Sequence, residues 1–141
     1  MNRKELRLAG ALLYECEGTK LRKDPRYKNT FIYAIEFTNS NPVLVSLFLR
    51  FMKEELGIDR SKIKGQLFLY PDLNRTQVMK TWSEKTSLPL EQFQKIIMLK
   101  AKVSKFKPNP LGTFKVRYSG KDKFLMLQDI IDDIWRDARV V

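Results

Sequence analysis

The sequence predicts an α+β fold in which helices cover one face of an antiparallel sheet. Four segments carry apolar residues at helical spacing, and five shorter ones have the β-branched, aromatic or alternating pattern of strands. A length of 141 residues suits a single domain, so one domain is expected over residues 1–141. The composition, 43% hydrophobic and 30% charged, is that of a globular protein rather than a disordered one.

The elements follow in an alternating order along the chain. Helices are expected at residues 5–17, 42–56, 74–86 and 121–138. Gly18 and Gly57 end the first two helices, and Pro42 stands at the start of the second after a run of capping residues. Strands are expected at residues 19–23, 31–38, 62–70, 94–103 and 112–119. A short helical turn around residues 88–93 and a Pro-containing loop over residues 104–111 complete the chain.

The positive charge is large and unevenly distributed. The chain has 27 basic and 16 acidic residues, a net charge of +11. Residues 62–121 carry 13 basic and 3 acidic residues, a net of +10, against +3 for residues 1–61 and −2 for residues 122–141. A fold does not need such a concentration, so it indicates a polyanionic partner, most simply nucleic acid. A membrane surface is a weaker interpretation, because these lysines do not lie on one amphipathic helix.

Several classes of protein are excluded by what the sequence lacks. The single cysteine, Cys16, rules out an intramolecular disulfide framework, and the absence of histidine rules out His-based catalysis and His metal ligands. No apolar run approaches the roughly 20 residues of a membrane span, and the N-terminus has no signal-peptide core. We therefore expect a cytoplasmic protein without a membrane partner.

The strand alternation predicts a sheet with one apolar and one basic face. In residues 113–119, Phe114, Val116 and Tyr118 share one face, and Lys115 and Arg117 share the other. Outward basic residues are common in any half-exposed sheet, but the repetition across several strands favours contacts with phosphates and bases. The expected nucleic-acid contacts are Lys20, Arg22, Lys62, Lys64, Gln66, Lys100, Lys102, Lys115 and Arg117.

Residues 8–18, LAGALLYECEG, resemble the signature motif of the LAGLIDADG homing endonuclease family. The match is an apolar, small-residue helix that ends in an acid followed by glycine, and the order of elements over most of the chain is similar to the family's core. The resemblance implies a saddle-shaped antiparallel sheet that binds double-stranded DNA. It also implies a homodimer, because two motif helices pack together in the family and this chain has one.

The resemblance also implies the site residues. Glu17 would be the catalytic residue. Glu17 and Gly18 together would bind a divalent metal ion, usually Mg²⁺. Ala9, Gly10 and Leu13 would lie in the dimer interface. Oxygen ligands suit Mg²⁺. Glu17 at a helix C-terminus is mildly unfavourable for the helix, which favours a functional role over that of an ordinary surface acid.

Two functions from different classes remain open. The first is a sequence-specific, Mg²⁺-dependent, homodimeric endonuclease that cuts double-stranded DNA. The alternative is a non-cleaving DNA-binding regulator with the same fold. A binder of structured RNA is a weaker third possibility, because A-form grooves suit a strand saddle less well. Trp82 and Trp135 are expected in the core rather than as platforms for bases, and Cys16 as a small buried residue.

Overall fold

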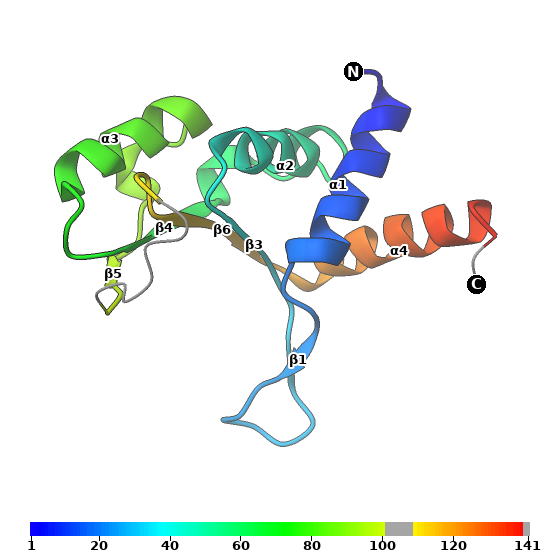
Figure 1. Cartoon of the computed structure of the whole chain (residues 1–141). Coiled ribbons are helices and arrows are strands. Elements are labelled where there is room, and N and C mark those ends of the chain that lie inside the picture. The colour runs from blue at the N-terminus through cyan, green and yellow to red at the C-terminus, as the bar shows by residue number, and fades with distance from the viewer. Residues whose placement is uncertain (101–108, 140–141) are drawn as a thin grey trace.

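The computed structural model describes residues 1–100 and 109–139, and its elements confirm an α+β fold (Figure 1). The helices are α1 (Arg3–Glu17), α2 (Pro42–Glu54), α3 (Arg75–Thr86) and α4 (Lys121–Asp137), with short 3-10 turns η1 (Arg60–Lys62) and η2 (Leu90–Gln92). The strands are β1 (Arg22–Lys23), β2 (Phe31–Ile32), β3 (Ala34–Asn39), β4 (Lys64–Leu69), β5 (Ile97–Met98) and β6 (Thr113–Ser119).

Asparagine side chains begin three of the helices. Asn2 accepts a hydrogen bond from the backbone N–H of Glu5, whose side chain in turn accepts from the backbone N–H of Asn2, a complete capping box. Asn41 and Asn74 cap α2 and α3 in the same way with their side-chain oxygens. These caps satisfy backbone donors that have no partner within the helix. The four helices expected from periodicity are therefore all present, with ends shifted by a few residues.

The main sheet has the strand order β3-β6-β4-β5. β6 is antiparallel to both β3 and β4, but β5 runs parallel to β4, so the expectation of a purely antiparallel sheet is wrong at this edge. The reason is α3, which follows β4 and returns the chain to the end of the sheet at which β4 began. The strand expected over residues 94–103 is limited, within the described residues, to Ile97–Met98.

β1 and β2 form a separate two-stranded antiparallel ribbon, which we call the arm (residues 21–32). Arg22 pairs with Ile32 at the base of the arm. In Figure 1 the arm projects away from α1, α2 and α3, on the other side of the chain from these helices. The expected strand 19–23 is thus only two residues long, and the expected strand 31–38 is divided at Tyr33 into β2 and β3.

The helices bury one face of the main sheet. α1, α2 and α4 pack against β3, and α3 packs against α2. Phe37 of β3 stacks on Phe48 of α2 with ring centroids 4.6 Å apart, and Trp82 of α3 stacks on Phe114 of β6 at 4.8 Å. The Trp82 ring N–H also donates to the Leu111 carbonyl at 2.7 Å, so this indole is a core residue as expected.

Trp135 and Cys16, which were both expected in the core, are less buried than expected. Trp135 of α4 is half-buried and packs against the edge of the core, in partial agreement with the expectation. Cys16 is exposed, so the expectation of a buried cysteine is wrong. The reason is its angular position on α1, whose buried side is formed by residues one turn apart, such as Leu6, Gly10 and Tyr14.

Tyr14 joins the end of α1 to the sheet. Its side chain is fully buried, and its hydroxyl donates to the carbonyl of Thr19 at 2.5 Å and accepts from the backbone N–H of Glu36 at 3.4 Å. Burial raises the pKa of this phenol to about 12, with the charge of Glu36 adding to the effect and a backbone hydrogen bond opposing it. The neutral hydroxyl is therefore the form that fits the fold.

Replacing Tyr14 with Phe should lower the free energy of unfolding by about 1–3 kcal/mol at neutral pH, because backbone groups lose their partner. The raised pKa adds a pH dependence. The folded state holds the phenolic proton more tightly than the unfolded state, so this contribution is complete below about pH 10 and is lost as the pH rises towards 12. Urea unfolding at pH 7, 9, 10 and 11 should therefore show the two proteins converging at alkaline pH. Tyr27→Phe at the exposed tip of the arm is the control, and a gap independent of pH would contradict the assignment.

Candidate nucleic-acid interface

The face of the main sheet opposite the helices, which we call the open face, carries polar and basic side chains. Alternation along β6 directs Phe114 and Val116 into the core and Lys115 and Arg117 to the open face. β4 contributes Lys64, Gln66 and Phe68 to the same face, and β3 contributes Ala34, Glu36 and Thr38. The alternation predicted for residues 113–119 is thus confirmed, and the register brings basic residues of two strands side by side.

The register places the charged residues in a row across three strands. Arg117 lies opposite Glu36 of β3 on one side and Lys64 of β4 on the other. Lys115 lies opposite Thr38 and Gln66 in the next row. Directly opposed residues in a sheet are close enough for their side chains to interact, so these rows form a continuous polar surface.

Glu36 is the centre of this surface, although the sequence patterns did not single it out. Its side chain is only 6% exposed. One carboxylate oxygen pairs with Arg22 at 3.0 Å and Arg117 at 3.1 Å. The other oxygen lies 3.9 Å from the Lys115 ammonium and accepts from the Thr19 hydroxyl at 3.4 Å. We call Glu36, Arg22, Lys115 and Arg117 the carboxylate cluster, and its three cations and one anion leave a net charge of +2.

Two of the expected contact residues are uncommitted. Lys62 and Lys64 are exposed and have no ion pair within residues 1–100 and 109–139. With Arg117, Gln94 and Ser119 they line an open hollow of about 690 Å³ beside the carboxylate cluster. The basic face therefore has two parts. One is a cluster in which the charges are partly neutralised, and the other is a hollow lined by exposed lysines that form no ion pair within the described residues.

Lys20 differs in position from the other expected contacts. The Lys20 ammonium folds back on the end of α1, where it donates to the carbonyls of Glu15 at 2.9 Å and Tyr14 at 3.2 Å. It also pairs with the Glu15 carboxylate at 3.3 Å, so Lys20 caps a helix rather than extending from the open face. Lys100 is exposed at the end of a described segment, and Lys102 lies outside the described residues.

Glu17 and Gly18 lie where α1 meets the sheet. Glu17 is exposed at the last position of the helix, and Gly18 forms a bridge with Phe37 of β3. The next residue, Thr19, donates its backbone N–H to the carbonyl of Glu36 at 3.0 Å. The end of α1 is therefore fixed to the strand that carries the centre of the carboxylate cluster.

Glu17 is a single carboxylate at this position. Across the described parts of the chain, no group of three or more His, Cys, Asp or Glu side chains could hold a metal ion. Mg²⁺ is commonly bound through one or two carboxylates together with substrate phosphates and water, and the donor chemistry of Glu17 fits that mode. In that mode, a substrate phosphate and water would supply the other oxygen ligands.

The three residues expected at a dimer interface do not share one exposed face. Gly10 is buried against α2, where a Cβ atom would overlap the Phe51 ring, so its small size serves packing within the chain. Ala9 and Leu13 are half-buried. The exposed apolar side chains of α1 are Leu8 and Leu12, at 46% and 40%, four residues apart and so on one face of the helix.

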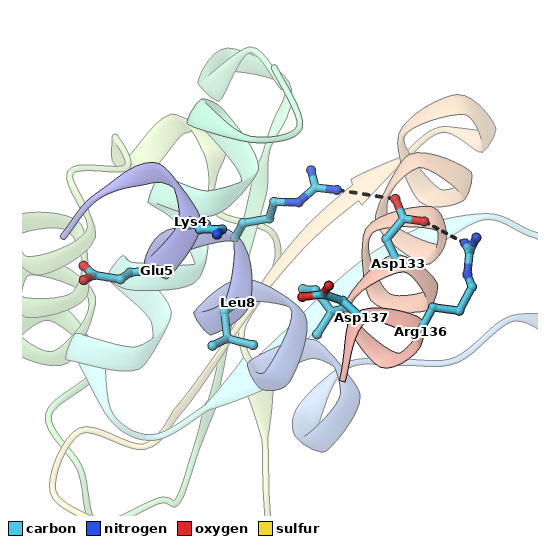
Figure 2. Close-up of a pocket in the computed structure, with 8 residues that line it drawn as sticks. Lys4, Glu5, Leu8, Asp133, Arg136 and Asp137 are labelled. Atoms are coloured by element: carbon cyan, nitrogen blue, oxygen red, sulfur yellow. Dashed lines mark hydrogen bonds and ion pairs between the residues drawn. The ribbon is translucent and has the colours of Figure 1, made fainter. Parts of the chain in front are cut away.

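Leu8 also borders a groove of about 760 Å³ between α1 and α4 (Figure 2). In this view Lys4 and Leu8 of α1 lie on one side of the groove, and Asp133 and Asp137 of α4 lie on the other. The two walls are joined by an ion pair of 3.6 Å between Arg7 and Asp133. The exposed side of α1 is therefore a mixed surface, with an apolar stripe beside paired charges.

Scans of the chain against protein-family models, curated proteins and solved structures returned no significant match. None of the helices within residues 1–100 and 109–139 is long and apolar enough to cross a membrane.

Proposed function

We propose that the chain binds double-stranded DNA through the open face and the arm. The observation that carries the proposal is the pair of uncommitted lysines, Lys62 and Lys64, beside the positively charged carboxylate cluster on a face left free by the helices. When ammonium groups on a positively charged surface neutralise phosphates, the cations condensed on the nucleic acid are released. This release drives nucleic-acid binding.

The arm favours a duplex with a wide major groove. It is a two-stranded ribbon with exposed Lys23, Tyr27 and Lys28 beyond the edge of the sheet. The major groove of B-form DNA, about 12 Å wide, admits such a ribbon, whereas the deep and narrow major groove of A-form RNA does not. DNA is therefore preferred over double-stranded RNA as the partner.

The free lysines should contribute directly to binding. The double variant Lys62→Gln, Lys64→Gln should weaken binding to duplex DNA and reduce the slope of log K against log salt by about 0.9 for each phosphate that is no longer neutralised. Fluorescence anisotropy with a labelled duplex between 50 and 200 mM salt measures both quantities. The matched control is Lys53→Gln, Lys80→Gln, which removes two exposed lysines from α2 and α3. Equal effects of the two double variants would contradict DNA binding at the open face.

We further propose that the chain acts as a homodimer joined through α1. The support is the exposed pair Leu8 and Leu12, together with the resemblance of this helix to motif helices that pack in pairs. Side chains this apolar on one face of a helix favour burial against a partner. A two-fold axis near α1 would bring two copies of Glu17 and two open faces to one duplex.

The double variant Leu8→Gln, Leu12→Gln should raise the dimer dissociation constant at least about tenfold, because a symmetric interface buries each of these leucines twice. Sedimentation velocity over a range of protein concentrations measures the constant. The control is Leu125→Gln, which changes a similarly exposed leucine on α4. Wild-type protein that stays monomeric at every concentration would overturn the homodimer.

A second candidate function, Mg²⁺-dependent cleavage of the bound DNA, is favoured by the position of Glu17. This carboxylate is exposed at the end of α1, next to the strand that bears the carboxylate cluster. A phosphate held by the basic face, together with water, would supply the remaining oxygen ligands of Mg²⁺. When bound there, the metal would stabilise charge on the phosphate oxygens. Without cleavage, the same surface would serve a DNA-binding regulator.

Glu17→Gln separates cleavage from binding. We expect this variant to lose Mg²⁺-dependent cutting and to keep its DNA affinity within about threefold, because one exposed carboxylate is neutralised and the fold is untouched. The substrate is a duplex selected from a random pool in the presence of Ca²⁺. Glu15→Gln, two residues earlier, is the control. A variant that cuts as well as the parent would exclude this role of Glu17, and a wild-type protein that binds but never cuts would establish the regulator.

A further inference from the structure

A buried carboxylate stands at the centre of the face proposed to receive phosphates. Glu36 repels phosphate, and an isolated charge of this kind would be costly to bury. The three surrounding cations offset that cost, and their distances of 3.0 to 3.9 Å show that all of them share this anion. For simple attraction of DNA, an uncharged residue at this position would serve better.

The partners of Glu36 come from two separate elements of the chain. Arg22 belongs to the arm, and Lys115 and Arg117 belong to β6. The two strands of the arm pair with each other and are not part of the main sheet. Among the ion pairs of the described residues, Arg22–Glu36 is the one that connects the arm to the main sheet. This ion pair adds a side-chain link to the backbone connection through Tyr33, by which β2 continues into β3.

We infer that Glu36 is a positioning residue that makes the DNA interaction selective, by fixing the arm and by restraining the attraction of the open face for phosphates in general. This inference rests on the proposed DNA binding. With Glu36 in place, Arg22 and Arg117 are held by its carboxylate. They can then bind only a duplex whose shape matches their fixed positions. Without it, three free cations attract any phosphate backbone.

The test compares Glu36→Gln with Glu54→Gln, which makes the same change in net charge at an exposed i,i+4 pair on α2. Affinity for a random-sequence duplex is measured from 50 to 200 mM salt. Glu36→Gln should bind more tightly at low salt. Each additional phosphate that it neutralises should make its affinity fall by about a further 3- to 4-fold across this salt range. Glu54→Gln and the charge-conserving Glu36→Asp should stay close to wild type.

Hydrogen exchange tests the positioning role without DNA. The amide of Asp24 donates to the Thr30 carbonyl at 2.7 Å within the arm, and it should exchange faster in Glu36→Gln but not in Glu54→Gln. Arg22→Gln is a second variant that changes a half-exposed side chain and leaves the core intact. It should also speed exchange in the arm, but it should reduce the salt slope instead of increasing it.

The failures of the two proposals are distinct. A wild-type protein with no salt-dependent affinity for duplex DNA would overturn the proposed function, and exchange in the arm would then decide the positioning role by itself. Binding by Glu36→Gln that is no tighter than that of Glu54→Gln would overturn the selective role. Unchanged exchange of the arm in both Glu36→Gln and Arg22→Gln would overturn the positioning role.

Discussion

The open face depends on one junction, where the end of α1 meets β3. The Tyr14 hydroxyl contacts the backbone of Thr19 and of Glu36, which lie 17 residues apart in the sequence and on opposite sides of the arm. Because this phenol is buried and its pKa is raised to about 12, the junction is held by hydrogen bonds of an uncharged hydroxyl. It fixes the end of α1 and the start of the arm relative to β3.

The position of β3 at this junction determines which charged residues lie side by side on the open face. β3 presents Glu36, the register with β6 brings Arg117 opposite to it, and the register with β4 brings Lys64 to the far side of Arg117. Across this surface, a carboxylate shared by several cations gives way to lysines that form no ion pair within residues 1–100 and 109–139. An incoming polyanion would therefore meet an exposed, highly charged edge first and an ordered centre second. In the proposed DNA complex, long-range attraction and close recognition would thus be separated on one surface.

The helices and the faces of the longer strands could be predicted from the sequence. Asn41-Pro42 and Asn74 are local signals, and the strict alternation of residues 113–119 needs no knowledge of their neighbours. β1, β2 and β5 are two residues long, too short to show any period, so their extent and the parallel pairing of β5 were not predictable.

Some residues of the candidate site could likewise be predicted from the sequence, and others could not. Arg22, Lys64, Lys115 and Arg117 were predicted because charge and alternation are visible in the sequence. Glu36 was missed because its role arises from pairing with β6, a strand far along the chain. A signal was nevertheless present, since an acid between Ile35 and Phe37 must face away from the core, towards the basic side of the sheet. Gly10 was predicted to lie in a dimer interface, whereas in the tertiary structure the Phe51 side chain occupies that side of α1.

The position of β6 has a consequence for synthesis of the chain. This strand is central in the sheet and separates β3 from β4, yet among the strands of residues 1–100 and 109–139 it comes last in the sequence. A nascent chain that ends before residue 113 therefore has two strands that lack the neighbour between them. Pairing at such sequence separation is slow, and the sheet can assemble only after residues 113–119 have been made. Until then the exposed strand edges are the part of the molecule most in need of protection by chaperones.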